Sequence, residues 1–107
     1  MDVDKIIKSL ANELDIEPII IDTYLKLLLH GAMDINQLSI DKNIIDILVR
    51  DGACIEINGK YQALNPKFAI TNMYRMKMMR DNRVVHKNNN IDRLATVIEG
   101  LMERRTK

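Results

Sequence analysis

The chain has 107 residues, of which 47% are hydrophobic and 29% charged, and its net charge is +1. That length fits one domain, the apolar fraction excludes a disordered chain, and the apolar runs fall far short of the roughly 20 residues of a membrane-spanning helix. The acidic start of the chain argues against a secretory leader. The single cysteine, Cys54, excludes a disulfide within the chain and a cysteine-based zinc site. We therefore expect a cytoplasmic protein without a membrane partner.

The first two predicted elements are helices. Apolar side chains spaced three or four residues apart predict an amphipathic helix over residues 3–14. A second helix is expected over 18–30, because Pro18 suits the first helical position and Gly31 suits the position after the last. His30 at its end has no local partner that would make it catalytic, so we interpret it as structural.

Two shorter helices are predicted next. Asp34 can cap a brief helix over 34–38, because its carboxylate can accept hydrogen bonds from the first backbone N–H groups. Ser39 or Asp41 can cap the following helix over 41–51 in the same way. We therefore expect two helices in close succession before the first strand.

A tight β-hairpin is predicted over residues 53–64. Asn58-Gly59 separates two short alternating strands, and this dipeptide is a strong hairpin signal because both of its residues tolerate a positive φ. The alternation places Cys54 on the face opposite Ile55 and Ile57. We interpret Cys54 as a small structural thiol.

The remainder of the chain predicts helices only. One is expected from Lys67 to about Arg83, after the start signal Asn65-Pro66, and another over 91–105 with Asn90 as its cap. The last helix carries an apolar stripe with the 3, 4, 3 spacing of coiled-coil positions, which packs either on helix 67–83 or on a second copy of the chain. We predict a homodimer through residues 67–105. The candidate dimer contacts are Ile91, Leu94, Ile98 and Leu101.

The order of helix, short helix, helix and hairpin is that of a winged helix-turn-helix. The predicted fold class is therefore mainly α with a small β-hairpin: a winged helix-turn-helix over residues 1–65, which includes the helix over 3–14, and a C-terminal helical dimerisation extension over 66–107. In this fold the second helix of the pair enters the DNA major groove, and the hairpin, called the wing, reaches the flanking backbone.

Three stretches carry a more specific pattern: residues 24–32 (YLKLLLHGA), 44–52 (IIDILVRDG) and 59–66 (GKYQALNP). Together they resemble the N-terminal DNA-binding domain of TrmB-type transcriptional regulators of archaea and bacteria. The most specific element is the last, in which a wing strand runs through Tyr and Ala into an Asn-Pro helix start. The resemblance covers about residues 18–70, and it implies a transcriptional regulator that binds double-stranded DNA.

Charge is divided unevenly along the chain. Residues 1–66 carry six basic and eleven acidic side chains, a net charge of −5, whereas residues 67–107 carry ten basic and four acidic ones, a net charge of +6. Such asymmetry favours a surface that faces a polyanion, although a basic helix lying against an acidic half, or plain solvated charge, would also produce it. We expect Arg80, Arg83 and Lys87 to share one helix face. The candidate DNA contacts are Lys42, Asn43, Arg50, Lys60, Arg75, Lys77, Arg80, Arg83 and Lys87.

A second function class stays open. Asp41, Asp46 and Asp51 make helix 41–51 acidic, which favours a winged-helix module that binds another protein without reading DNA. An enzyme is not expected, because the chain has no glycine-rich phosphate loop or His-Glu-x-x-His motif, and neither His30 nor His86 has a partner nearby in sequence. We assign no catalytic residue, no metal ligand and no cofactor.

Overall fold

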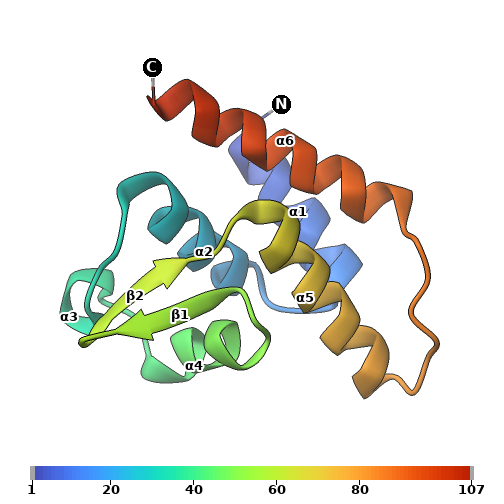
Figure 1. Ribbon diagram of the computed structural model, residues 1–107, viewed down its shortest axis with the longest axis horizontal. Coiled ribbons are helices and arrows are strands. Elements are labelled where there is room, and N and C mark those ends of the chain that lie inside the picture. The colour runs from blue at the N-terminus through green and yellow to red at the C-terminus, as the bar shows by residue number, and fades with distance from the viewer. Residues whose placement is uncertain (1, 107) are drawn as a thin grey trace.

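The computed structural model describes the backbone of residues 2–106 and the side chains of residues 2–103. Mainly helical, the described chain also contains one antiparallel two-stranded hairpin, so the coarse fold class predicted above is confirmed (Figure 1). Its elements in chain order are α1 (Val3–Leu14), α2 (Pro18–His30), α3 (Ile35–Leu38), α4 (Lys42–Arg50), β1 (Cys54–Ile57), β2 (Lys60–Ala63), α5 (Pro66–Arg80) and α6 (Asn89–Thr106).

Side-chain caps fix where several helices begin. Asp34 and Gln37 form a reciprocal capping box at the start of α3. The Asp41 carboxylate accepts a hydrogen bond from the backbone N–H of Asn43 at 3.0 Å, so Asp41, and not Ser39, caps α4. Asn65 caps α5 in the same manner ahead of Pro66. Each such cap contributes about 1 kcal/mol to stability, and all three come from local sequence chemistry.

The hairpin forms where it was predicted. Asn58 and Gly59 have φ angles of 52° and 81°, as a two-residue turn of this kind requires, and Ile57 pairs with Lys60 across it. The predicted alternation is confirmed as well, because Cys54 is buried whereas Ile55 and Ile57 are exposed on the other face.

A single-residue bridge joins the hairpin to the loop between α2 and α3. Met33 and Tyr61 exchange two backbone hydrogen bonds, of 3.1 Å and 2.7 Å, and so form an isolated antiparallel bridge on the free side of β2. The bridge fixes the position of the hairpin relative to the end of α2. It was not predicted, because 28 positions separate the two residues in the sequence.

One hydrophobic core joins both parts of the chain. Side chains from α1 and α2, such as Ile6 and Tyr24, belong to the same buried cluster as Ile70 of α5 and Ile98 of α6. Figure 1 shows α6 lying across α1 and α5, above the part that contains α3, α4 and the hairpin. The acidic first part and the basic second part therefore share a single interior.

The apolar stripe of α6 packs within the same chain. Ile91, Leu94 and Ile98 are at most 3% exposed, and α6 packs mainly on α5. This outcome corrects the assignment of these three side chains as contacts to a second copy, because their apolar surface is already covered. Leu101, the fourth candidate, is half-buried and packs against the same core.

Helix α5 ends at Arg80, three residues earlier than predicted. Asp81 caps its C-terminus, and Asn82 follows with a left-handed φ of 55°, which turns the chain out of the helix. Arg83 and Lys87 consequently lie in an extended linker, and the prediction that they share a helix face with Arg80 is wrong. Asn88, not Asn90, caps α6, since its side-chain oxygen accepts from the N–H groups of the two residues that follow Asn89.

Candidate nucleic-acid interface

Helix α4 presents a polar face to solvent. Its buried side is apolar, with Ile45 and Leu48 fully inside, and this amphipathic pattern sets the helix against α2. The exposed positions of α4 carry Lys42, Asn43, Asp46, Val49 and Arg50. Lys42, Asn43 and Arg50 are three of the nine predicted DNA contacts. The acidic Asp46 lies on the same exposed face.

Two arginines from different helices meet on one carboxylate next to this face. Asp51, the residue after α4, is only 2% exposed. Arg50 Nε donates to Asp51 Oδ1 at 2.9 Å, and Arg80 Nη1, from the last residue of α5, lies 3.3 Å from both carboxylate oxygens. The hydrogen bond to Asp51 and the charge of its carboxylate raise the pKa of the Arg50 guanidinium. Sequence reasoning placed Asp51 on an acidic outer face, whereas it is buried and paired.

An open hollow lies beside this cluster. Its volume is about 410 Å³, and the turn between α1 and α2 forms its opposite side. Asn43, Arg50 and Arg80, which were predicted separately from the sequence, line it together. The other lining residues are the apolar Ile16, Ile20, Ile44 and Ile47 and the acidic Asp15 and Glu17.

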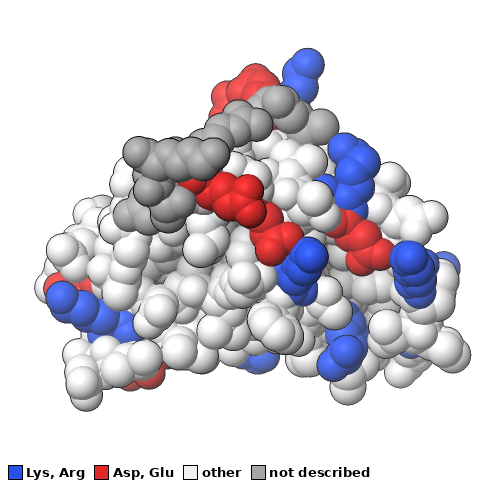
Figure 2. All heavy atoms as spheres, turned by 45° about the horizontal axis from the view of Figure 1, so that its top comes forward, with Lys and Arg blue, Asp and Glu red and all other residues white. Residues whose placement is uncertain are grey.

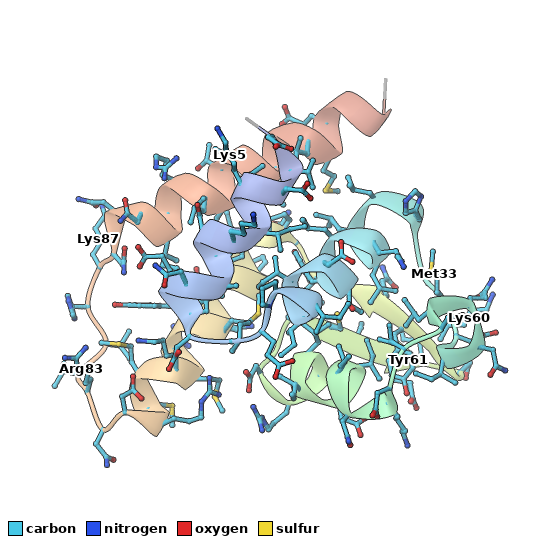
Figure 3. The ribbon with its side chains drawn as sticks, turned by 180° about the vertical axis from the view of Figure 1, so that it is seen from behind. Lys5, Met33, Lys60, Tyr61, Arg83 and Lys87 are labelled. Atoms are coloured by element: carbon cyan, nitrogen blue, oxygen red, sulfur yellow. The ribbon has the colours of Figure 1, made fainter. Side chains whose placement is uncertain are left out.

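Two further predicted contacts lie on either side of α4. Lys60 stands at the tip of the hairpin, whereas Arg83 follows α5 in the linker (Figure 3). Figure 3 shows them near opposite ends of the long axis, with α4 between them along the lower part of the molecule. That axis measures 36 Å in the Cα trace. We call the set Lys42, Asn43, Arg50, Lys60, Arg80 and Arg83 the basic edge.

The remaining three candidates do not join the basic edge. Lys77 forms an ion pair of 3.4 Å with Asp81, and its side chain is only 18% exposed. Arg75 lines a groove of about 670 Å³ on another side of α5, together with Phe68 and Glu99. Figure 2 shows basic and acidic side chains interspersed on the face it displays, without one continuous basic patch.

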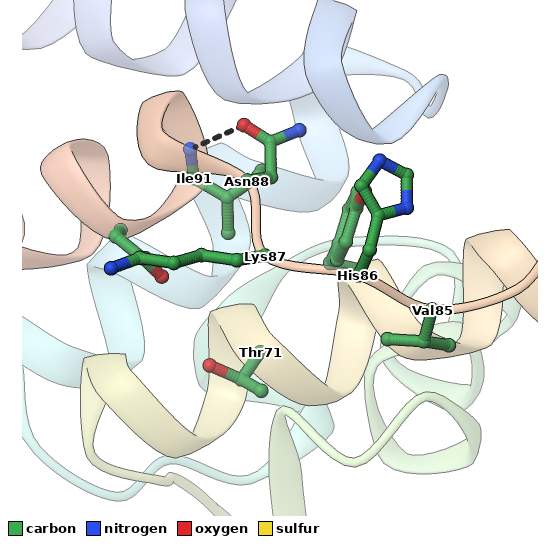
Figure 4. A pocket seen from close by; sticks show the side chains of 8 residues that line it. Thr71, Val85, His86, Lys87, Asn88 and Ile91 are labelled. Carbon is green, nitrogen blue, oxygen red and sulfur yellow. Dashed lines mark hydrogen bonds between the residues drawn. The ribbon is translucent and has the colours of Figure 1, made fainter.

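Lys87 belongs to a separate, smaller pocket of about 280 Å³ under the linker (Figure 4). His86 and Lys87 line it from the linker, Thr71 lines it from α5, and Asp92 lines it from α6. Figure 3 places Lys87 higher than Arg83, toward α6. No sequence pattern indicated this pocket, because it depends on where the linker turns.

Comparison of the chain with protein-family models, with curated proteins and with solved structures found no match. None of the helices in the described part of the chain is both long and apolar enough to cross a membrane. Among the side chains of residues 2–103, no group of three or more from histidine, cysteine and the acidic residues is arranged to hold a metal ion.

Proposed function

We propose that the protein binds double-stranded DNA through a winged helix-turn-helix and acts as a transcriptional regulator. The order of α2, the bridging Met33, α3, α4 and the hairpin supports this fold. In it, α4 takes the place of the helix that enters the major groove, and the hairpin takes the place of the wing. The resemblance of residues 18–70 to TrmB-type regulators points in the same direction.

The observation that carries the proposal is the arrangement of the basic edge. In Figure 3, α4 lies between Lys60 on the hairpin and Arg83 in the linker, and Arg80 is the last residue of α5. Lys42 and Asn43 stand at the N-terminal end of α4, where contacts to base edges concentrate in this fold.

Salt dependence tests this proposal. Lys42, Lys60 and Arg83 on one phosphate each, with the cluster of Arg50, Arg80 and Asp51 on a fourth, would give a slope of log K against log salt of about −3.6. The affinity should therefore fall about 150-fold between 50 and 200 mM salt. Fluorescence anisotropy with a labelled duplex of about 20 base pairs measures both quantities. No binding at 50 mM salt, or a slope near zero, would overturn DNA binding.

Matched variants then locate the interface. Lys60→Gln and Arg83→Gln remove one cation each from the basic edge, so each should reduce the magnitude of the salt slope by about 1. Lys87→Gln removes the same charge from the pocket under the linker and should leave the slope unchanged. Equal effects of all three variants would mean that the interface is not the basic edge.

A protein-binding module is the second candidate. The observation in its favour is a set of exposed apolar side chains on α4 and the hairpin, namely Val49, Ile55 and Ile57, close in sequence to the acidic Asp41 and Asp46. Under this alternative, Lys42→Glu and Lys60→Glu would leave binding of the partner protein intact. Asp41→Lys and Asp46→Lys would abolish that binding. DNA binding predicts the reverse ranking.

We also propose that the protein is a homodimer, since two copies related by a two-fold axis would suit a pseudo-palindromic DNA site. The exposed apolar groups of α5 are the surface that a second copy would cover: Phe68 is 70% exposed and Met79 59%. Light scattering at high micromolar concentration tests this part. A monomeric mass would refute the homodimer. If the protein is a dimer, Phe68→Ser with Met79→Ser should yield a folded monomer.

A further inference from the structure

The junction of α4 and α5 holds a carboxylate where a DNA-binding surface would ordinarily avoid one. Asp51 lies beside the basic edge, directly after Arg50 in the sequence, and it forms ion pairs with both Arg50 and Arg80. A carboxylate at such a place repels phosphate unless it is neutralised. Here two guanidiniums share it, so the cluster of three side chains keeps a net charge of +1.

The two guanidiniums retain donors that the carboxylate does not use. Arg50 contacts Asp51 through Nε alone, and Arg80 does so through Nη1. Their other nitrogens have no hydrogen-bond partner among the residues that the structure describes. The two side chains are 57% and 39% exposed, so these remaining N–H groups are open to solvent.

We infer that Asp51 is a positioning residue that holds Arg50 and Arg80 as a pair for one phosphodiester group of the DNA backbone. This inference rests on the proposed DNA binding. A free arginine side chain loses rotamer freedom when it binds a phosphate, and fixing it beforehand reduces that cost. The buried carboxylate fixes two arginines at once, and it does so from different helices.

The surroundings of the pair include two carboxylates that act by charge alone. Asp15 and Glu17 line the opposite side of the hollow, and both are exposed. Glu17 stands at the start of α2 without a side-chain hydrogen bond to the helix. Glu17→Gln therefore removes one negative charge from the same hollow and breaks no side-chain contact that the structure shows.

The comparison of Asp51→Asn with Glu17→Gln gives opposite expected signs for the same change of charge. Glu17→Gln should raise the affinity for a duplex by about 2- to 5-fold at 50 mM salt, as expected for loss of one exposed repulsive charge. Asp51→Asn should lower the affinity by about 10-fold or more, because both arginines lose their anchor. It should also reduce the magnitude of the salt slope by about 1, because the pair contacts one phosphate.

Thermal unfolding by circular dichroism shows whether each variant is folded at the temperature of the binding assay. If Asp51→Asn does not fold, Arg80→Lys serves in its place. Lysine keeps the charge but lacks the further guanidinium nitrogens, which Arg80 leaves open to solvent while its Nη1 contacts both oxygens of Asp51. The inference predicts weaker duplex binding for Arg80→Lys at unchanged net charge.

The outcomes separate the inference from the proposed function. A wild-type protein that does not bind duplex at 50 mM salt overturns DNA binding and the inference with it. A wild-type protein that binds, together with a folded Asp51→Asn variant that binds equally or more tightly, overturns the inference alone. In that case Asp51 only joins α4 to α5. The inference is likewise overturned if Asp51→Asn does not fold and Arg80→Lys binds as tightly as wild type.

Discussion

Replacing Gly52 with alanine tests how the turn after α4 docks on α5. Gly52 has a left-handed φ of 76°, and Asn72 of α5 donates a hydrogen bond of 2.9 Å from Nδ2 to its carbonyl oxygen. A Cβ atom at Gly52 would stand 2.9 Å from that Nδ2 and 3.1 Å from the Asn72 Cβ. The new methyl group therefore collides with the residue that holds the turn in place.

The expected cost has two parts. A left-handed conformation costs a residue with a Cβ atom about 1–2 kcal/mol. Displacing Asn72 removes a partly buried hydrogen bond, worth about 1 kcal/mol. Gly52→Ala should thus lower the free energy of unfolding by about 2–3 kcal/mol, which corresponds to a fall in Tm of about 10–20 °C for a domain of this size.

Urea unfolding followed by circular dichroism measures this cost, and Gly59→Ala is the matched control. Gly59 has a similar φ of 81°, but a Cβ atom there would have no neighbour within 4 Å. Gly59→Ala should therefore lower the free energy of unfolding only by the cost of the left-handed conformation. In the Asn72→Ala background, Gly52→Ala should cost about 1 kcal/mol less than in wild type, because the hydrogen bond is already absent.

Equal destabilisation by Gly52→Ala and Gly59→Ala would contradict a collision with Asn72. An equal cost of Gly52→Ala with and without Asn72 would contradict it as well. Either result would mean that the turn after α4 does not depend on its contact with α5.

Three further outcomes follow from the core. Leu94→Ala should lower the free energy of unfolding, measured by urea unfolding, by about 3 kcal/mol. The loss should be the same at every protein concentration, because Leu94 packs within one chain. A loss that grows on dilution would contradict this packing. Tyr24→Phe removes the hydrogen bond of 2.7 Å that the phenol donates to the Leu64 carbonyl oxygen, so the same measurement should show a loss of about 1–2 kcal/mol. Burial raises the pKa of the Cys54 thiol from 9.0 to about 12, so the unfolded chain loses this proton first and stability should fall between pH 9 and pH 12, by up to about 1.4 kcal/mol per pH unit. Cys54→Ala should remove this part of the slope in urea unfolding at pH 8 and pH 10, and an unchanged slope would refute the assignment.

Local chemistry made much of the fold predictable from the sequence. Asp34 and Asn65 cap the helices that they were expected to cap, and Asn58-Gly59 forms the turn between two strands. Each of these features depends on neighbours within about four residues. Sequence patterns report such short-range chemistry directly.

Features that depend on distant partners, and one helix end that no glycine or proline marks, were missed or misassigned. The stripe through Leu94 correctly predicted an apolar helix face, but periodicity alone does not say whether the same chain or a second copy covers it. The end of α5 was placed too late because no glycine or proline marks it; Asp81 and Asn82 end it instead. The ion pair of Asp51 with Arg80 spans 29 positions, so no local pattern indicated that this carboxylate is buried.

The candidate site was predictable in its residue types and not in its grouping. Basic residues were identified correctly as exposed at Lys42 and Lys60. The position of Lys60 relative to Arg83 depends on the break after α5. Arg75 lines a groove on a different side of that helix. A helical wheel that continued through residue 87 therefore grouped residues that the fold separates.

The shared core has a consequence for synthesis on the ribosome. Ile6 of α1 is fully buried in the finished protein, in the same cluster as Ile98 of α6, 92 positions later. At a translation rate of about 5–20 residues per second, α1 emerges roughly 5–20 s before α6, which packs on it together with α2 and α5. During that interval the part of its apolar face that α6 covers is open to chaperones and to other nascent chains. Any slowing of translation between α5 and α6 would lengthen this exposure.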